Sequence, residues 1–315
     1  MSFADALGIT APLFALILLG FCLARFAKWP VAVGDALGRF VFGIAIPALL
    51  LNLTSDLARM PAIDWRVLIV YFGACLAIFA LARLLVARTL SLDGVGASVF
   101  AMGSTYGNLV LLGIPLTKSV LGEPAVPTVA LIIVFNSVFL WTLVTLSVES
   151  ARGAGWSPRA LARVFKGVLS NPIIVAIAIG ALLSLAGVSL PGAVRSTLGL
   201  LGQAAVPLAL VTLGMGLAVH EVRGEIREAL AIGALKLFLL PALVWTLAYL
   251  VGLPPIETQT LILLSSVPLG VNAYLAAREF GALQGAVSSA VLLSTLASAA
   301  LMPLLLLAVV GLAKD

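Results

Sequence analysis

Charged residues are scarce in this chain of 315 amino acids: Asp, Glu, Lys and Arg make up 10% of it, whereas hydrophobic residues make up 62%. A soluble domain needs roughly a quarter of its residues charged to cover its surface. The composition therefore excludes an ordinary soluble protein. The net charge of +5 does not indicate nucleic-acid binding, because the Lys and Arg residues lie in short connections between hydrophobic runs.

Cysteine and histidine are also nearly absent. Cys22 and Cys75 each lie in an apolar run without metal-ligand spacing, so we expect both to be small packing residues and expect no metal and no cofactor. The single histidine, His220, stands at the end of a run beside Glu221, and the chain has no G-x-S-x-G motif. This inventory argues against an enzyme.

What the chain does contain is a series of hydrophobic runs, each of about 20 residues, the length that crosses a bilayer. The runs are 8–27, 35–54, 66–88, 94–121, 126–148, 168–187, 196–219, 229–251, 257–280 and 285–311. The first is followed, not preceded, by Arg25 and Lys28, which indicates a retained helix and not a cleaved signal peptide. The sequence predicts an all-α integral membrane protein with ten transmembrane helices.

The basic residues predict the orientation of these helices. If the runs alternate in direction, twelve Lys and Arg residues fall on one side of the membrane and five on the other. The first group is Arg25, Lys28, Arg39, Arg83, Arg88, Arg152, Arg159, Arg163, Lys166, Arg223, Arg227 and Arg278; the second is Arg59, Arg66, Lys118, Arg195 and Lys314. The positive-inside rule places the first group in the cytoplasm and both termini on the periplasmic side of a bacterial inner membrane.

The two halves of the chain resemble each other. The longest and most basic connection, 149–167, is predicted to be a cytoplasmic linker between residues 1–148 and 168–315, with five runs in each half. Segment 43–53 aligns with 203–213, and the identical pairs are Ala45/Ala205, Pro47/Pro207, Leu50/Leu210 and Leu53/Leu213. An odd number of spans per half inverts the second half, and inverted five-helix repeats are typical of secondary transporters.

A second repeated feature, in segments 104–115 and 265–274, is a polar stretch interrupted by Gly or Pro in the middle of a run. A broken helix is tolerated in a membrane only where protein or a water-filled cavity satisfies its backbone groups. We therefore expect the fourth and ninth spans to face the interior. The residues predicted to break them are Gly107, Gly113, Pro115, Pro268 and Gly270.

The side chains at these breaks are candidates for substrate binding. Helix N-termini at a break suit a carboxylate, and freed carbonyl groups suit a cation. The candidates are Asn108 and Asn272, with the hydroxyl residues Ser104, Thr105, Ser265 and Ser266. Alternatively, these groups only hydrogen-bond between helices. That is the role expected for Asn52, Asn136 and Gln203, which lie in unbroken runs, while Pro47, Pro207 and Pro241 are expected to kink their helices.

Lys236 is the one basic residue well inside a run, and it either faces the cavity or reaches the membrane surface with its long stem. Acidic residues, by contrast, all lie at run ends or in connections. A proton antiporter with paired carboxylates needs an acid near the midplane, so this mechanism is disfavoured. A sodium site of carbonyls and amides stays open, but uncoupled anion exit is the simpler mechanism.

The chain resembles the auxin efflux carrier family, which includes bacterial permeases for malonate and malate. The resemblance rests on Gly107-Asn108 with Gly113-Ile114-Pro115-Leu116, on Asn171-Pro172, on Lys236 with Pro241, and on Val267-Pro268 with Asn272 and Ala276-Ala277. It implies a fold similar to the bile acid/sodium symporter, in which helices four and nine cross within a domain that moves like an elevator. It also implies a homodimer through the scaffold helices.

The predicted function is therefore a secondary transporter for small organic anions, with its site where the fourth and ninth spans meet. The connection 149–167 is short compared with the large hydrophilic loop of the long plant auxin exporters, which favours a small carboxylate over auxin. An anion channel and a sodium-coupled organic anion symporter are the alternatives.

Overall fold

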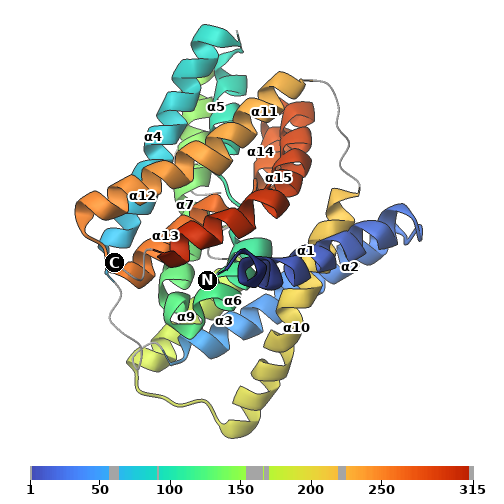
Figure 1. The fold of residues 1–315 in the computed structure, drawn as a ribbon, viewed down its shortest axis with the longest axis vertical. Helices are drawn as coiled ribbons and strands as arrows, with labels where there is room; N and C mark the ends of the chain where they lie inside the picture. The colour runs from blue at the N-terminus through green and yellow to red at the C-terminus, as the bar shows by residue number, and fades with distance from the viewer. Residues whose placement is uncertain are drawn as a thin grey trace.

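The computed structural model describes residues 2–56, 64–90, 92–153, 166, 170–218 and 225–311, and within them all regular structure is helical (Figure 1). The α-helices are α1 (Phe3–Arg25), α2 (Val31–Phe40), α3 (Ile46–Thr54), α4 (Arg66–Thr89), α5 (Gly94–Gly103), α6 (Ile114–Leu121), α7 (Val126–Ala151), α9 (Pro172–Leu185), α10 (Gly192–Leu217), α11 (Ile226–Ala234), α12 (Leu240–Val251), α13 (Pro255–Ser266), α14 (Val271–Phe280) and α15 (Gln284–Gly311). The shorter segments are the π-helices η1 (Val41–Ala45), η3 (Leu109–Gly113) and η5 (Leu235–Leu239) and the 3-10 turn η4 (Glu123–Ala125).

Seven helices in the described part of the chain are long and apolar enough to cross a membrane. They are Phe3–Arg25, Val31–Thr54, Arg66–Val86, Glu123–Ala151, Gly192–Leu217, Ile226–Val251 and Gln284–Val309. Each lies within a few residues of a predicted run, which confirms a multi-pass membrane protein. The other three predicted runs contain shorter helices: α5, η3 and α6 in the fourth, α9 in the sixth, and α13 and α14 in the ninth.

Several sequence predictions fall on residues that the structure does not describe. Of the predicted linker 149–167, only residues 149–153 and 166 are described. The residues outside the described part include Arg59, Arg159, Arg163, His220, Glu221, Arg223 and Lys314.

Each π-helical segment ends two residues before a proline, namely Pro47, Pro115 or Pro241. Proline has no N–H, and its ring clashes with the carbonyl four residues back. The residue before each proline instead donates its N–H to the carbonyl five residues back, as Ile46 does to Val41. The irregularity predicted at Pro47 and Pro241 therefore takes the form of a π-turn, whereas α10 continues through Pro207 without one.

The helices form two packed groups. In the first group, α1 packs against α10, and α3 packs against both α9 and α10, in the lower half of Figure 1. In the second group, α4 packs against α5 and α12, α5 against α7, α12 against α13, and α15 against α11 and α14. Contacts between α1 and α15 join the groups. We call the first group the scaffold group and include η1, which contacts α3, α9 and α10. We call the second the site group and include the non-helical residues 104–108 that follow α5.

Glycines allow the closest helix contacts in the scaffold group. A Cβ atom on Gly20 of α1 would overlap the backbone carbonyl of Val211 in α10. A Cβ atom on Gly180 of α9 would meet the side chain of Thr54 and the carbonyl of Leu51 in α3. Small residues of this kind let helix backbones approach each other in a membrane, where no hydrophobic effect drives association.

Candidate functional site

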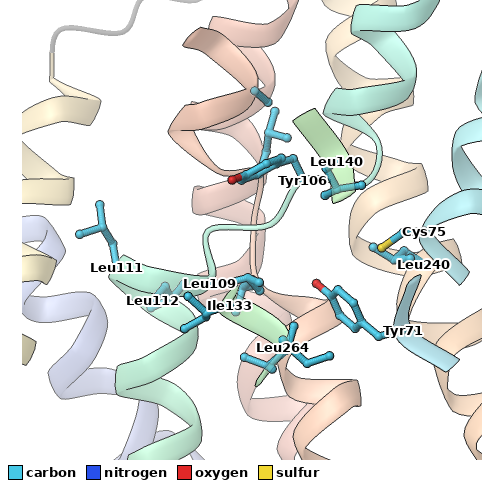
Figure 2. Packing of buried hydrophobic residues seen from close by; sticks show 14 of the residues in the cluster. Tyr71, Cys75, Tyr106, Leu109, Leu111, Leu112, Ile133, Leu140, Leu240 and Leu264 are labelled. Carbon is cyan, nitrogen blue, oxygen red and sulfur yellow. The ribbon is translucent and has the colours of Figure 1, made fainter. Parts of the chain in front are cut away.

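The fourth predicted run is interrupted between α5 and η3. Helix α5 ends at Gly103, residues 104–108 are not helical, and Asn108 caps the helix that follows. The Asn108 side-chain oxygen accepts a hydrogen bond from the Leu111 N–H at 3.3 Å. Figure 2 shows this break running from Tyr106 to Leu109 through packed, buried side chains.

The ninth predicted run is interrupted in the same way, and its break pairs with that of the fourth. Residues 267–270 separate α13 from α14. Gly107 and Leu269 form an isolated antiparallel bridge. The Asn108 N–H donates to the Pro268 carbonyl at 2.8 Å, and the Gly270 N–H donates to the Tyr106 carbonyl at 2.9 Å. Each break therefore satisfies backbone groups that the other exposes, which is how broken helices survive inside a membrane.

Two of the predicted glycines permit this pairing. A Cβ atom on Gly270 would lie 2.8 Å from the Gly107 carbonyl oxygen, and one on Gly107 would lie 3.0 Å from a methyl group of Val267. The other predicted break residues have different positions. Pro268 supplies a bridging carbonyl, Gly113 ends the π-helix η3, and Pro115 is the second residue of α6.

Next to the paired breaks lies a cavity of about 150 Å³ that contains four asparagines, which we call the asparagine cavity. They are Asn108, Asn136, Asn171 and Asn272, from the fourth, fifth, sixth and ninth spans. The remaining lining residues are Phe42, Tyr106, Gly107, Leu109, Val110, Leu111, Ile133, Ile173, Ile174, Gly270 and Val271. No charged side chain is among these described lining residues.

Helix capping fixes the orientation of two of the asparagines. Because a backbone N–H can donate only to the oxygen of a carboxamide, the Asn108 oxygen is held by Leu111. The Asn171 oxygen likewise accepts from the Ile173 N–H at 2.9 Å and caps α9. The amide nitrogens remain for other partners. Asn108 is 6% exposed, and its amide nitrogen is buried without a hydrogen-bond partner in the described structure.

The other two asparagines differ from each other. Asn272 is exposed, and its amide nitrogen donates to the Tyr106 hydroxyl at 2.9 Å. Asn136 is 3% exposed, and its side-chain oxygen is buried without a partner in the described structure. The interhelical hydrogen bond expected for Asn136 is therefore not made by this oxygen. Asn136, Asn171 and Tyr106 line this cavity, but sequence reasoning did not select them as binding residues, although Tyr106 lies within the polar stretch that it singled out.

Three helix N-termini meet at this cavity: those of η3–α6 at Asn108, α9 at Asn171 and α14 at Gly270. A helix N-terminus has N–H groups without intrahelical partners and the equivalent of roughly half a positive charge. The cavity therefore combines positive potential with N–H donors. Such an environment favours a carboxylate over a cation.

A larger cavity of about 1250 Å³ adjoins the asparagine cavity, and we call it the vestibule. The residues that line both are Phe42, Leu111, Asn171, Val271 and Asn272. The charged side chains of the vestibule are Arg25, Asp35 and Arg39, a net charge of one positive unit. This charge favours the arrival of anions.

The four predicted hydroxyl residues do not line the asparagine cavity. Their hydroxyl groups are buried and donate to backbone carbonyls three or four residues earlier, near the C-terminal ends of α5 and α13. The bonds are Ser104 to Phe100 at 3.0 Å, Thr105 to Ala101 at 3.2 Å, Ser265 to Ile262 at 2.9 Å and Ser266 to Ile262 at 2.7 Å. The structure therefore brings Asn108 and Asn272 together without these hydroxyls.

Lys236 also lies outside the asparagine cavity. Its side chain is fully buried, and its ammonium group donates to the backbone carbonyl of Ser265 at 2.5 Å. This carbonyl belongs to the C-terminal turn of α13, where helix carbonyls lack intrahelical partners and carry partial negative charge. Within the described residues, no carboxylate forms an ion pair with Lys236.

The two remaining intramembrane amides lie away from the cavities. The Asn52 side-chain oxygen is buried without a partner in the described structure, and Gln203 is exposed on α10. Neither residue lines the asparagine cavity or the vestibule.

Comparison with known proteins identifies the family. The profile of the family described as "Membrane transport protein" matches residues 6–306. A Rhizobium meliloti protein whose name proposes malonate transport is 30% identical over 94% of this chain and 93% of its own. Uncharacterised transporters of Methanothermobacter thermautotrophicus and Methanocaldococcus jannaschii are 25% and 24% identical over 92% and 80% of this chain, and 93% and 82% of their own. With its apolar helices and paired helix breaks, the chain belongs to this membrane transport protein family, the auxin efflux carrier family that its motifs resemble.

Proposed function

We propose that this protein is a secondary transporter of small organic acid anions, mono- or dicarboxylates such as malonate or malate. The observation that carries the proposal is the buried, unpartnered amide nitrogen of Asn108 in a cavity bounded by three helix N-termini. An unpaired buried donor costs about 1–3 kcal/mol, and a carboxylate oxygen would supply the missing acceptor. The Rhizobium relative supports malonate as the first acid to test.

The size of the cavity supports a small substrate. A cavity needs roughly 10–15 Å³ to hold one water molecule, so the asparagine cavity of about 150 Å³ has room for on the order of ten water molecules. A three- or four-carbon dicarboxylate fits this space, whereas drug-sized ligands occupy pockets of roughly 300–1,000 Å³. An auxin-sized acid would have to extend into the vestibule.

The polarity of the site supports an uncoupled anion carrier over a sodium-coupled symporter. The oxygens of Asn108 and Asn171 are held by helix N–H groups, which leaves amide donors for the ligand. The Ser265 carbonyl at the end of α13 already accepts from the Lys236 ammonium. An inside-negative potential of about 100 mV would then contribute roughly 2.3 kcal/mol per negative charge expelled.

The finer architecture that we propose is ten spans in two inverted repeats, residues 1–148 and 168–315, joined by the cytoplasmic linker 149–167. The contacts of the scaffold group support it. Gly20 of α1, in the first half, packs on Val211 of α10, in the second half. Gly180 of α9, in the second half, packs in the same way on Leu51 of α3, in the first half. The 160-residue offset relating Gly20 to Gly180 also relates Leu51 to Val211, and it is the offset of the aligned segments 43–53 and 203–213.

The mechanism that we propose is elevator-type alternating access. The site group contains Asn108, Asn136 and Asn272, and it would carry the anion past the scaffold group. In a bacterial inner membrane with both termini periplasmic, the vestibule with Arg25 and Arg39 would open to the cytoplasm. A homodimer through the scaffold helices completes the proposal.

Counterflow in proteoliposomes tests this function. Vesicles loaded with unlabelled malonate should transiently accumulate external labelled malonate, because a carrier exchanges substrate while a channel dissipates the gradient. Accumulation should persist when choline replaces sodium and should fall at least tenfold in Asn272→Ala, on the order expected for a lost hydrogen bond to a charged ligand. Thr246→Ala is the control, since Thr246 is exposed on α12 and bonds only to its own helix.

Three results would each reject part of the proposal. No accumulation of malonate or malate by the wild type would reject the substrate class. Flux without counterflow would favour a channel, and dependence on sodium would favour a symporter.

A further inference from the structure

Asn171 differs from the other three cavity asparagines in the helix group to which it belongs. It caps α9, which packs against α3 in the scaffold group. Asn108 lies at the break that follows α5 and caps η3, and Asn136 and Asn272 lie in α7 and α14, so all three belong to the site group. Of the lining residues that the scaffold group contributes, which are Phe42, Asn171, Ile173 and Ile174, Asn171 alone has a polar side chain.

The local sequence determines which part of the Asn171 amide group caps α9 and which part can bind a ligand. Pro172 follows it and has no N–H, so the first N–H available to the cap is that of Ile173, which the Asn171 oxygen accepts at 2.9 Å. The amide nitrogen is the part of the side chain left to donate. Asn171 is half-buried and lines both cavities, so this donor lies at their junction.

A second observation points to an anion in the asparagine cavity, next to this junction. Within the described residues, the Asn108 amide nitrogen is buried without a hydrogen-bond partner, and Asn108 lines the same asparagine cavity as Asn171. An anion that supplies its acceptor would therefore lie between donors from the two helix groups. If the anion moves with the site group, its contact with Asn171 links the site group to the scaffold group, whereas its contact with Asn108 stays within the site group.

We propose that Asn171 is a substrate ligand in the vestibule-open state only, and that it sets the affinity on that side of the membrane. This inference rests on the proposed transport function. When the site group moves against the scaffold group, Asn108 travels with the substrate and Asn171 stays behind. Loss of the Asn171 donor therefore weakens binding from the vestibule side and leaves binding from the opposite side unchanged.

The test compares malonate uptake in everted and right-side-out membrane vesicles, which present opposite faces of the protein. Asn171→Ser retains an oxygen that caps α9 and removes the amide donor, and Asn171→Asp retains the cap and adds a negative charge. We expect KM to rise about 10- to 100-fold from the vestibule side, the effect of one hydrogen bond to a charged ligand. KM from the other side should match the wild type, and Asn108→Ser should raise KM from both sides.

Thr197→Ala is the matched control, because Thr197 is exposed on α10 in the same helix group and donates only to its own helix. Melting temperatures in detergent verify that each variant folds. Equal increases in KM on both sides, or no increase on either, would overturn the role of Asn171 while transport by the wild type still supports the proposed function. If the wild type takes up neither malonate nor malate from either side, both proposals fall together.

Discussion

Replacing Asn108 by Ser or by Asp separates two contributions to anion binding. Each replacement keeps a side-chain oxygen that can cap η3, as the Asn108 oxygen does for the Leu111 N–H. Each also removes the amide nitrogen that is buried without a partner. The two variants differ in charge, since Asp places a carboxylate where the substrate carboxylate is proposed to bind.

The expected losses follow from these differences. Asn108→Ser removes one hydrogen bond to a charged group, which is about 1.5–3 kcal/mol, or roughly 10- to 150-fold in affinity. Asn108→Asp adds repulsion between two carboxylates. At about 4 Å and an effective dielectric constant of about 20, this repulsion is about 4 kcal/mol, or roughly a further thousandfold. The order of affinity should be wild type, then Ser, then Asp.

Malonate binding to purified protein, measured by calorimetry, tests this order, with melting temperatures in detergent to verify folding. If Asn108→Asp binds malonate as tightly as the wild type while both variants fold, the cavity does not hold the anion. Unchanged binding by Asn108→Ser would show that the amide nitrogen does not touch the substrate, even if transport occurs.

Two further predictions concern stability. Gly270→Ala places a Cβ atom 2.8 Å from the Gly107 carbonyl oxygen, so we expect a destabilisation of about 1–3 kcal/mol and a lower melting temperature. Gly233→Ala, which has open space around it in α11, should not lower it, and a Gly270→Ala protein as stable as the wild type would contradict the tight pairing of the breaks. The Arg66 side chain donates to Asp64 and holds the pKa of this carboxyl below its ordinary 3.8. The pair therefore stabilises the fold fully above about pH 3.8, and this stabilisation is lost as the pH falls through the lowered pKa. Asp64→Asn should therefore melt below the wild type at pH 7 and together with it once the pH lies below the lowered pKa of Asp64; a difference that is independent of pH would contradict this assignment.

The positions of the helix breaks follow from local chemistry, which is why the sequence predicts them. Gly107 is unfavourable in a regular helix because of its backbone entropy, and Pro268 would remove a helix hydrogen bond; both lie in non-helical segments. The π-turns before Pro47 and Pro241 have the same local cause. The apolar spans are equally local, because each needs only enough hydrophobic residues to cross a bilayer.

The composition of the asparagine cavity is not local. Asn136 and Asn171 are separated from Asn108 in sequence and meet it only because α7 and α9 pack beside the break. Asn136 lies in an unbroken helix, where the sequence offers no reason to prefer a cavity over an interhelical hydrogen bond. The resemblance to the family marked Asn171-Pro172 but did not assign Asn171 to the site.

The sequence by itself determined the membrane class, the approximate spans and the two interrupted segments, because hydrophobic length and the backbone limits of Gly and Pro act within one stretch of chain. Only the tertiary structure decided which polar groups share a cavity. Hydroxyls such as Ser104 and Ser265 turn to backbone carbonyls three or four residues earlier, and Lys236 turns to the end of α13. The Asn108 amide has no such partner nearby in the chain. A polar side chain in a membrane takes the nearest partner that the packed helices offer, and that choice depends on contacts that the linear sequence does not contain.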